Sequence, residues 1–365
     1  MINVAKTDLP TLKEYNLYLR KIWKSRWLTN NGVLFQEFQM KLKNYLKVKY
    51  ILPVSNGTLA LQVAIKALDL KGEIITTPFT FAATTTSIIW ENCTPIFADI
   101  DPVTFNINPL DVEKKITKKT SAILAVHVYG NPCAVEELEK IAKKHHIKII
   151  YDAAHTFGVE YKNQSVLNYG DISTLSFHAT KTFHTIEGGA IVTNSEKLYD
   201  KLKLLINFGI ESEESVVLPG INAKMNEFQA AMGLCNLNKI NDRIKKRKNI
   251  YTTYLSKLNK KYISFQNVSA TKFNYTYMPV AFSSKNIRDD IFTKLLNNDI
   301  KARKYFYPLT NSFKFVNSDD NIKSETTIAK KVSDSILCLP IYSSLSFSTV
   351  AKIIKIVNSS FQFNT

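Results

Sequence analysis

The residues from Asp171 to Thr193, DISTLSFHATKTFHTIEGGAIVT, combine the side chains best suited to covalent chemistry. We predict strands over residues 171–177 and 190–193, because both runs are short, apolar and rich in β-forming side chains. Lys181 lies in the loop between them with two histidines, a glutamate and no other cation. Partial burial would disfavour the ammonium form of this lysine and leave a nucleophilic amine. Lys181 is therefore a candidate to form a Schiff base.

A carboxylate upstream of this lysine narrows the chemistry. Asp152 ends the hydrophobic run KIIYD. Pyridoxal 5′-phosphate (PLP) needs a lysine at its aldehyde carbon and an acid at its ring nitrogen, because the acid keeps the pyridinium protonated and electron-withdrawing. An isolated aspartate at a strand end would be explained equally well as a turn or helix-cap residue. Together with Lys181, Asp152 predicts a PLP site.

A small-residue turn favours a phosphate site. Residues 55–58, SNGT, follow a predicted strand and precede a predicted helix over residues 59–68, whose apolar side chains recur at helical spacing. Free backbone N–H groups and the helix dipole favour an anion at such a junction. A simple helix cap would explain the same four residues. We expect the phosphate of PLP at Gly57 and Thr58.

The motifs around these residues resemble the PLP-dependent sugar-nucleotide aminotransferases, which are fold-type-I enzymes. The resemblance extends from about Thr29 to Leu309, and it is carried by DAAH at residues 152–155, SFHATK at 176–181 and EGG at 187–189. It implies an α/β fold: a large domain with a mostly parallel sheet flanked by helices, and a smaller C-terminal α/β domain. It also implies amination of a keto sugar on a nucleotide diphosphate.

The resemblance implies roles for individual residues. Lys181 would hold PLP and act as the catalytic acid–base group, Asp152 would pair with the ring nitrogen, and His155 would hydrogen-bond the ring hydroxyl. Ser176 would join Thr58 at the phosphate. A satisfied interior histidine is the alternative interpretation of His155.

Other implied contacts come from more distant segments. Phe81 would stack on the pyridine ring, whereas Phe79 is better explained as a core aromatic. Asn226 would reach the phosphate from the neighbouring subunit, which implies a homodimer with a shared active site. Ordinary surface positions would also explain two of the candidate substrate residues, Lys224 and Arg303. The candidate substrate-binding residues are Thr29, His178, Glu187, Lys224, Arg303 and Tyr305.

The elements that must carry these residues alternate between strand and helix, which predicts a parallel sheet with helices on both faces. Ser55, Phe81, Asp152 and Ser176 all lie at the carboxyl ends of predicted strands, so they should meet at one edge of that sheet. No GxGxxG motif follows a strand, so a Rossmann domain is not expected. We place the domain boundary along a helix that starts near Asn226. This gives a PLP-binding domain at residues 1–240 and a small domain at 241–365.

Composition excludes several other classes. The 365 residues are 45% hydrophobic and 22% charged, as in a soluble globular protein. No stretch is long and apolar enough to span a membrane and no signal-peptide core is present, so we expect a cytoplasmic protein. The four cysteines form no CxxC pair, and His178 and His184 lack a convincing third metal ligand, so no metal is expected.

The net charge of +17 raises the alternative of a basic nucleic-acid-binding protein. Because lysines are spread along the whole chain and no nucleic-acid-binding motif accompanies them, we do not expect nucleic acid as a partner. A basic surface would instead attract a nucleotide-sugar diphosphate.

The lysine loop also bears on the reaction. Related enzymes with a histidine in place of the Schiff-base lysine dehydrate their substrate, so Lys181 favours transamination. The pattern SFHxxK…EGG resembles family members that aminate C4 of the sugar, whereas members acting at C3 more often show Tyr-Pro before the lysine and Gly-Asp after it. We expect a dTDP-linked 4-keto-6-deoxy sugar with L-glutamate as amino donor, for surface polysaccharide such as the O-antigen of lipopolysaccharide. A C3-specific or differently configured sugar-nucleotide aminotransferase is the alternative.

Overall fold

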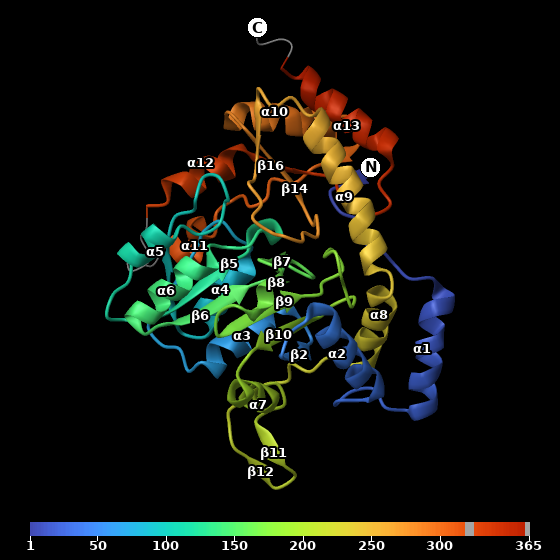
Figure 1. Ribbon diagram of the computed structural model, residues 1–365, viewed down its shortest axis with the longest axis vertical. Helices are drawn as coiled ribbons and strands as arrows, with labels where there is room; N and C mark the ends of the chain where they lie inside the picture. The colour runs from blue at the N-terminus through green and yellow to red at the C-terminus, as the bar shows by residue number, and fades with distance from the viewer. Residues whose placement is uncertain (318–324, 362–365) are drawn as a thin grey trace.

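The computed structural model describes residues 1–317 and 325–361, and its main feature is a seven-stranded sheet (Figure 1). The strands lie in the order β2-β10-β9-β6-β5-β3-β4. Their bounds are β2 Tyr50–Val54, β3 Glu73–Thr76, β4 Thr94–Phe97, β5 Thr120–Val126, β6 Lys148–Asp152, β9 Ile172–Ser176 and β10 Gly189–Thr193.

Within this sheet, β10 runs antiparallel to both of its neighbours, and every other pair is parallel. The exception follows from the connection between β9 and β10, which contains no helix. A parallel return would need a crossover of a dozen or more residues, usually helical. The mostly parallel sheet expected from the sequence is confirmed.

Side chains of the central strands alternate between two layers of helices. On β5, Ala122 and Leu124 pack in the core under α3, α4 and α7, whereas Ile123 and Ala125 pack under α5 and α6. Strands buried on both faces have near-continuous apolar runs, as β5 has from Ala122 to Val126. The helices are α3 Gly57–Ala67, α4 Ala82–Trp90 and α7 Glu196–Leu205 on one face, and α5 Pro109–Lys114 and α6 Val135–His145 on the other.

Three helices cover the β2–β10 end of the sheet. α2 (Val33–Leu46) and α8 (Glu227–Leu237) pack together against β9 and β10, and α1 (Leu12–Ser25) lies beside α8 (Figure 1). The sequence predicts a helix over about residues 33–46, and these are the observed bounds of α2. The chain then continues from α8 into the 18-residue helix α9 (Ile240–Lys257).

The C-terminal part forms a second, smaller core. Antiparallel strands β13 (Ile263–Phe265), β14 (Met278–Phe282) and β16 (Ile336–Leu339) make a three-stranded sheet. Its fully buried core residues lie between Ile250 and Phe361. We propose on this basis that the small domain begins at the α8–α9 junction, near residue 240. The accompanying helices are α10 Lys285–Leu296, α11 Lys314–Asn317, α12 Thr327–Ser335 and α13 Phe347–Ser359.

Short elements complete the fold. The N-terminal strand β1 pairs in parallel with β15 of the C-terminal part. A hairpin of β11 and β12 projects from the body of the molecule below α7 (Figure 1). The bounds are β1 Ile2–Asn3, β7 Glu160–Tyr161, β8 Gln164–Ser165, β11 Ile210–Ser212, β12 Ser215–Val216 and β15 Ile300–Lys301, with 3-10 turns at Val128–Gly130, Val166–Asn168 and Thr310–Ser312.

Among residues 1–317 and 325–361, no helix combines the length and apolar character needed to cross a bilayer. All four cysteines are free and buried, as expected of reduced core thiols.

Candidate active site

A single cavity of about 800 Å³ opens at the carboxyl edge of the large sheet. This is the edge at which ligands bind in open α/β sheets, and the volume lies in the usual range for small-molecule sites. Eleven of the residues singled out from the sequence line it. They are Gly57, Thr58, Phe81, Asp152, His155, Ser176, His178, Lys181, Glu187, Arg303 and Tyr305.

Lys181 lies half-buried in the loop between β9 and β10, where its backbone N–H donates to His178 O at 2.9 Å. The pKa of this amine is lowered to about 8, mainly by burial; the carboxylate of Asp152 opposes the decrease, and the charge of Arg303 adds to it. A substantial fraction of Lys181 is therefore unprotonated and nucleophilic near neutral pH.

Asp152 ends β6 and is 6% exposed. Thr84 Oγ1 donates to its Oδ2 at 2.7 Å, and the backbone N–H of Ala154 donates to its Oδ1 at 3.1 Å. Burial raises the pKa of the carboxyl, and these two hydrogen bonds oppose the increase by stabilising the ionised form. Thr84 in turn shares a hydrogen bond with Thr80 at 2.8 Å, so a short chain of hydroxyls supports the carboxylate.

The turn before α3 comes very close to the end of β9. A β-carbon built on Gly57 would lie 2.9 Å from Cβ of Ser176, so the approach requires glycine. Asn56 caps the helix through a bond from Leu59 N to its Oδ1 at 2.8 Å. Thr58 and Ser176 both line the cavity at this helix N-terminus. This arrangement suits an anion such as a phosphate.

Two phenylalanines after β3 differ sharply in exposure. Phe79 is fully buried and packs edge-on against Phe105, Tyr129 and Phe306, as expected of a core aromatic. Phe81 begins α4 and is 51% exposed, with its side chain at the cavity. An exposed aromatic face at a cavity offers a stacking surface for a planar ring.

The wall formed by the C-terminal part carries aromatic side chains and a cation. His155 is buried, and Tyr277 Oη lies 3.4 Å from its Nε2. Burial, together with the charges of Lys181 and Arg303, holds the pKa of His155 well below its usual range, so the imidazole is neutral. The guanidinium of Arg303 lies 4.0 Å from the ring centroid of Tyr305, which fixes this cation at the cavity.

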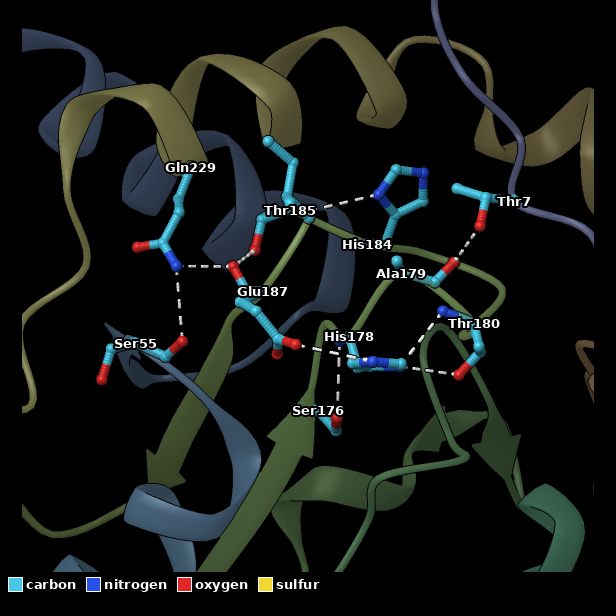
Figure 2. Close-up of polar contacts among 11 residues, drawn as sticks. Thr7, Ser55, Ser176, His178, Ala179, Thr180, His184, Thr185, Glu187 and Gln229 are labelled. Atoms are coloured by element: carbon cyan, nitrogen blue, oxygen red, sulfur yellow. Dashed lines mark hydrogen bonds and ion pairs between the residues drawn. The ribbon is translucent and has the colours of Figure 1, made fainter.

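His178 and Glu187 lie at the exposed mouth of the cavity. Their side chains are 46% and 56% exposed, and Nε2 of His178 is 3.5 Å from Oε1 of Glu187 (Figure 2). His178 Nδ1 also shares a hydrogen bond with Thr180 Oγ1 at 2.8 Å. These two side chains can therefore contact a ligand that extends out of the cavity.

Three predicted residues lie outside this cavity. Thr29 is in an exposed segment before α2. Lys224 lines a separate cavity of about 290 Å³, with its Nζ 4.6 Å from the ring centroid of Phe208. Asn226 caps α8, where its Oδ1 accepts from Gln229 N at 2.9 Å. The fold thus separates these residues from the site in their own chain.

Sequence reasoning missed several residues of the site. Thr80 lies between Phe79 and Phe81 in the sequence. Thr84 follows Phe81 by about one helical turn, and this spacing could have indicated that Thr84 faces the same side of α4 as Phe81. Tyr277 comes from the C-terminal part, immediately before β14, and no local pattern indicates it.

The arrangement fits PLP, as expected from the sequence. A desolvated lysine, a buried carboxylate held by two donors, an exposed aromatic face and an anion-binding turn all border one cavity. In the part of the chain that the structure describes, no three His, Cys, Asp or Glu side chains gather closely enough to hold a metal ion.

Comparison with known proteins identifies proteins of similar sequence and fold. Residues 11–358 match the model of the DegT/DnrJ/EryC1/StrS aminotransferase family. The chain is 43% identical to a dTDP-4-amino-4,6-dideoxy-D-glucose transaminase from Shigella dysenteriae over 98% of each chain. Two solved structures are also similar. DesI in the presence of its TDP-sugar product has a TM-score of 0.93 and 28% identity, over 100% of this chain and 93% of that one. NtdA from Bacillus subtilis with bound cofactor PMP has a TM-score of 0.89 and 27% identity, over 96% and 82%.

Proposed function

Because the chain belongs to the DegT/DnrJ/EryC1/StrS aminotransferase family, we propose that it transfers the amino group of L-glutamate to C4 of a dTDP-linked 4-keto-6-deoxy sugar. The family, the fold and the PLP-dependent enzyme class expected from the motifs are confirmed. One observation carries the proposed substrate: the similarity to a dTDP-4-amino-4,6-dideoxy-D-glucose transaminase extends along almost the whole of both chains.

We assign the residues that hold the cofactor from the contacts in the cavity. Lys181 would attach its aldehyde carbon, Asp152 would hold its ring nitrogen, and His155 would face its hydroxyl. Gly57, Thr58 and Ser176 would hold its phosphate, and Phe81 would cover its ring. When bound, PLP supplies an electron sink that stabilises negative charge on the carbon from which a proton leaves.

Lys181 is the group that we assign to proton transfer. A general acid–base group works best when its pKa is near the operating pH, and burial brings the pKa of Nζ to about 8. The amine can therefore take up a proton and return it without a large free-energy cost. Asp152 is assigned an electrostatic role, because its carboxylate is buried and hydrogen-bonded on both oxygens.

The two substrates must occupy the site in turn, as a ping-pong reaction requires. Both substrates carry negative charge, so the site needs a positively charged side chain that is not already used to hold the cofactor. Arg303 lies at the cavity wall against Tyr305 and suits a carboxylate or a phosphate. His178 and Glu187 at the mouth are candidates for contact with the sugar.

We also propose a homodimer with shared active sites. Thr29, Lys224 and Asn226 lie outside the cavity of their own chain, which agrees with a contribution to the site of a neighbouring subunit. The projecting hairpin near them exposes large apolar side chains. These are Phe208, Ile210, Val216, Val217 and Ile221. Exposed apolar groups gathered on one projection are typical of a protein–protein contact.

The proposed product is a precursor of surface polysaccharide, including the O-antigen of lipopolysaccharide, and we propose the cytoplasm as the location. Nucleotide sugars are phosphorylated anions, and the net charge of +17 favours their approach to the protein.

The reaction is tested by incubating the protein with PLP, L-glutamate and dTDP-4-keto-6-deoxy-D-glucose. We expect 2-oxoglutarate and a sugar nucleotide with nitrogen at C4, identified by two-dimensional NMR. The Lys181→Ala variant is the control and should form no product. Nitrogen at C3, or turnover only with a 3-keto sugar, would refute the proposed position of amination and leave the family membership intact.

A further inference from the structure

The side chain of Gln229, on the first turn of α8, joins three segments that border the site (Figure 2). Its Nε2 donates to Glu187 O at 2.8 Å and lies 3.4 Å from Ser55 O. Its Oε1 accepts from Asn226 N at 3.1 Å. One amide thus connects the loop that carries Lys181, the turn before α3 and the start of α8.

The segment that Gln229 contacts is strained. Ile186 has φ of 73°, a left-handed conformation that is rare for a β-branched residue. Such residues persist only when their surroundings fix them. Here Ile186 N donates to His184 Nδ1 at 3.3 Å, and Glu187 O accepts from Thr185 Oγ1 at 2.7 Å as well as from Gln229.

The base from which Gln229 reaches the loop is itself fixed. Two residues earlier on α8, the buried Glu227 accepts from the backbone N–H groups of Leu34 and Phe35 at 2.9 and 2.8 Å. Because these N–H groups belong to the first turn of α2, the start of α8 is tied to a second helix. Gln229 therefore holds the strained segment from a rigid support.

We propose that Gln229 is a positioning residue for the transamination. It would set the distance between the loop of residues 177–188 and the turn of residues 55–58, and thereby the position of Lys181 relative to the phosphate-binding groups. Gln229 itself does not line the cavity. The proposal rests on the roles proposed above for Lys181 and for the turn before α3.

The variant Gln229→Glu separates this role from the helix cap. Its carboxylate can still accept from Asn226 N, and a negative charge is favourable in the first turn of a helix. It cannot donate to Glu187 O or Ser55 O, and it places a third oxygen against two carbonyl oxygens. Gln229→Met is a second variant, which removes the donor without adding charge.

Gln266→Glu is the matched control. The Nε2 of Gln266 also donates to two carbonyl oxygens in separate segments, those of Thr104 at 2.7 Å and Val128 at 3.1 Å, and none of these residues lines the cavity. The control therefore loses the same kind of hydrogen bond between segments that include neither the loop of Lys181 nor the turn before α3.

Two quantities are measured for each protein: the melting temperature without cofactor, and the dissociation constant for PLP from absorbance or fluorescence titration. We expect all variants to melt at lower temperature than the parent. Only the two Gln229 variants should bind PLP more weakly, by about two- to tenfold, which is the change in affinity that corresponds to the loss of one hydrogen bond.

The proposal is overturned if both Gln229 variants bind PLP as tightly as Gln266→Glu. If Gln229→Glu does not fold, Gln229→Met decides alone. A parent protein that binds no PLP would refute the proposed function itself. The two outcomes can be told apart, because the proposal about Gln229 fails only when the parent protein binds PLP and its Gln229 variants bind PLP equally well.

Discussion

At the scale of single residues, burial decides the proposed chemistry. The same desolvation that lowers the pKa of Lys181 raises the pKa of Asp152, and both groups face one cavity. The charge of Arg303 adds to the decrease in the pKa of Lys181, and the hydroxyl of Thr84 opposes the increase in the pKa of Asp152. Reactivity at this site is consequently a property of the folded cavity and not of the residue types alone.

Cofactor uptake should depend on pH through Lys181. Only the unprotonated amine attacks an aldehyde, so the rate at which cofactor-free protein takes up PLP should rise with pH and level off above about 8. Because the folded pKa lies below the ordinary value of 10.5, the folded state releases this proton first, and Lys181 favours folding more as pH rises through that window.

Stopped-flow absorbance between pH 6 and pH 10 measures this dependence. Arg303→Gln should move the inflection to higher pH, because the cation that lowers the pKa is removed. Asp152→Asn should move it to lower pH, because the carboxylate that raises the pKa is lost. A rate in the parent protein that shows no inflection below pH 10 would contradict the burial argument.

Thr84 should matter to the cofactor through Asp152. Thr84→Val removes the hydroxyl that donates to Oδ2 of Asp152, so the pKa of this carboxyl should rise beyond the increase that burial already causes. The charge of Lys181 still lowers this pKa in the variant, and the buried thiol of Cys133 lies nearby. A hydrogen bond to a charged group contributes about 1.5–3 kcal/mol, which corresponds to about 1–2 pH units. The acid limit of PLP binding should move upward by that amount.

Titrations of PLP binding at several pH values test this effect. Thr84→Ser should restore the parent profile. Thr86→Val is the control on the same helix, because the Thr86 hydroxyl donates to Ala82 O within α4. Identical profiles for Thr84→Val and Thr86→Val would show that the hydroxyl of Thr84 does not support Asp152.

Residues in local motifs could be predicted from the sequence, because the strand, the turn and the functional side chain lie within a few residues of one another. Lys181, Asp152 and Gly57 are of this kind. Tyr277 and Gln229 could not be predicted, since the first comes from the C-terminal part and the second acts through backbone atoms of other segments. Such contacts depend on packing over more than 40 residues of sequence, which no local pattern encodes.

At the scale of elements, the N-terminal segment connects parts that are far apart in sequence. β1 pairs with β15, and Ile341 N donates to Val4 O at 3.1 Å. Further along the segment, Thr7 Oγ1 donates to Ala179 O at 3.0 Å, and Asp8 O lies 3.0 Å from His184 Nε2 (Figure 2 shows the Thr7 contact). The first eight residues thus connect the C-terminal part of the chain, at β15 and Ile341, to the loop that carries Lys181.

The carboxylate of Asp8 should stabilise the fold. It accepts a hydrogen bond from Ser343, and its charge acts on the buried guanidiniums of Arg243 and Arg247. Burial lowers the pKa of Arg247 to about 10, and Nε of Arg247 has no hydrogen-bond partner in the described structure. Asp8→Asn should therefore lower the free energy of unfolding by about 1–3 kcal/mol.

Chemical denaturation of the cofactor-free protein measures this loss. Asp69→Asn is the control, because Asp69 is 77% exposed and its ion pair with Lys201 lies at the surface, where such pairs contribute about 0–1 kcal/mol. Equal losses for the two variants would show that Asp8 is an ordinary surface charge.

Among the properties of the helices and strands, the direction of β10 is the main one that could not be predicted from the sequence. Its β-forming residues and the glycine pair before it predict a strand, but strand direction depends on how the chain returns from β9. The apolar runs predict strands over residues 95–100 and 122–129, whereas the observed β4 and β5 end at Phe97 and Val126. After β5 the chain turns into a 3-10 segment at Val128–Gly130 instead of continuing as a strand.

At the scale of the whole molecule, the proposed dimer makes a specific prediction about mixed subunits. Lys181→Ala removes the lysine. Asn226→Asp keeps a good helix cap for α8 but places a negative charge toward a phosphate. If Asn226 serves the neighbouring site, each mixed dimer contains one site with both native residues. Mixing the two inactive variants should therefore restore transamination.

The measurement is turnover at limiting PLP after the two variants are unfolded and refolded together, with separately refolded variants mixed afterwards as the control. No recovery, in a mixture shown by sizing to contain dimers, would indicate that Asn226 acts within its own chain.

The location of PLP in the chain tests the central claim most directly. The loaded protein is reduced with borohydride, digested, and searched by tandem mass spectrometry for the lysine that carries a pyridoxyl group. With 42 lysines in the chain, a chance assignment to one position is improbable. The account predicts the pyridoxyl group on Lys181 and its loss in Lys181→Ala. A pyridoxyl group on another lysine, or none on a parent protein given excess PLP, would contradict it.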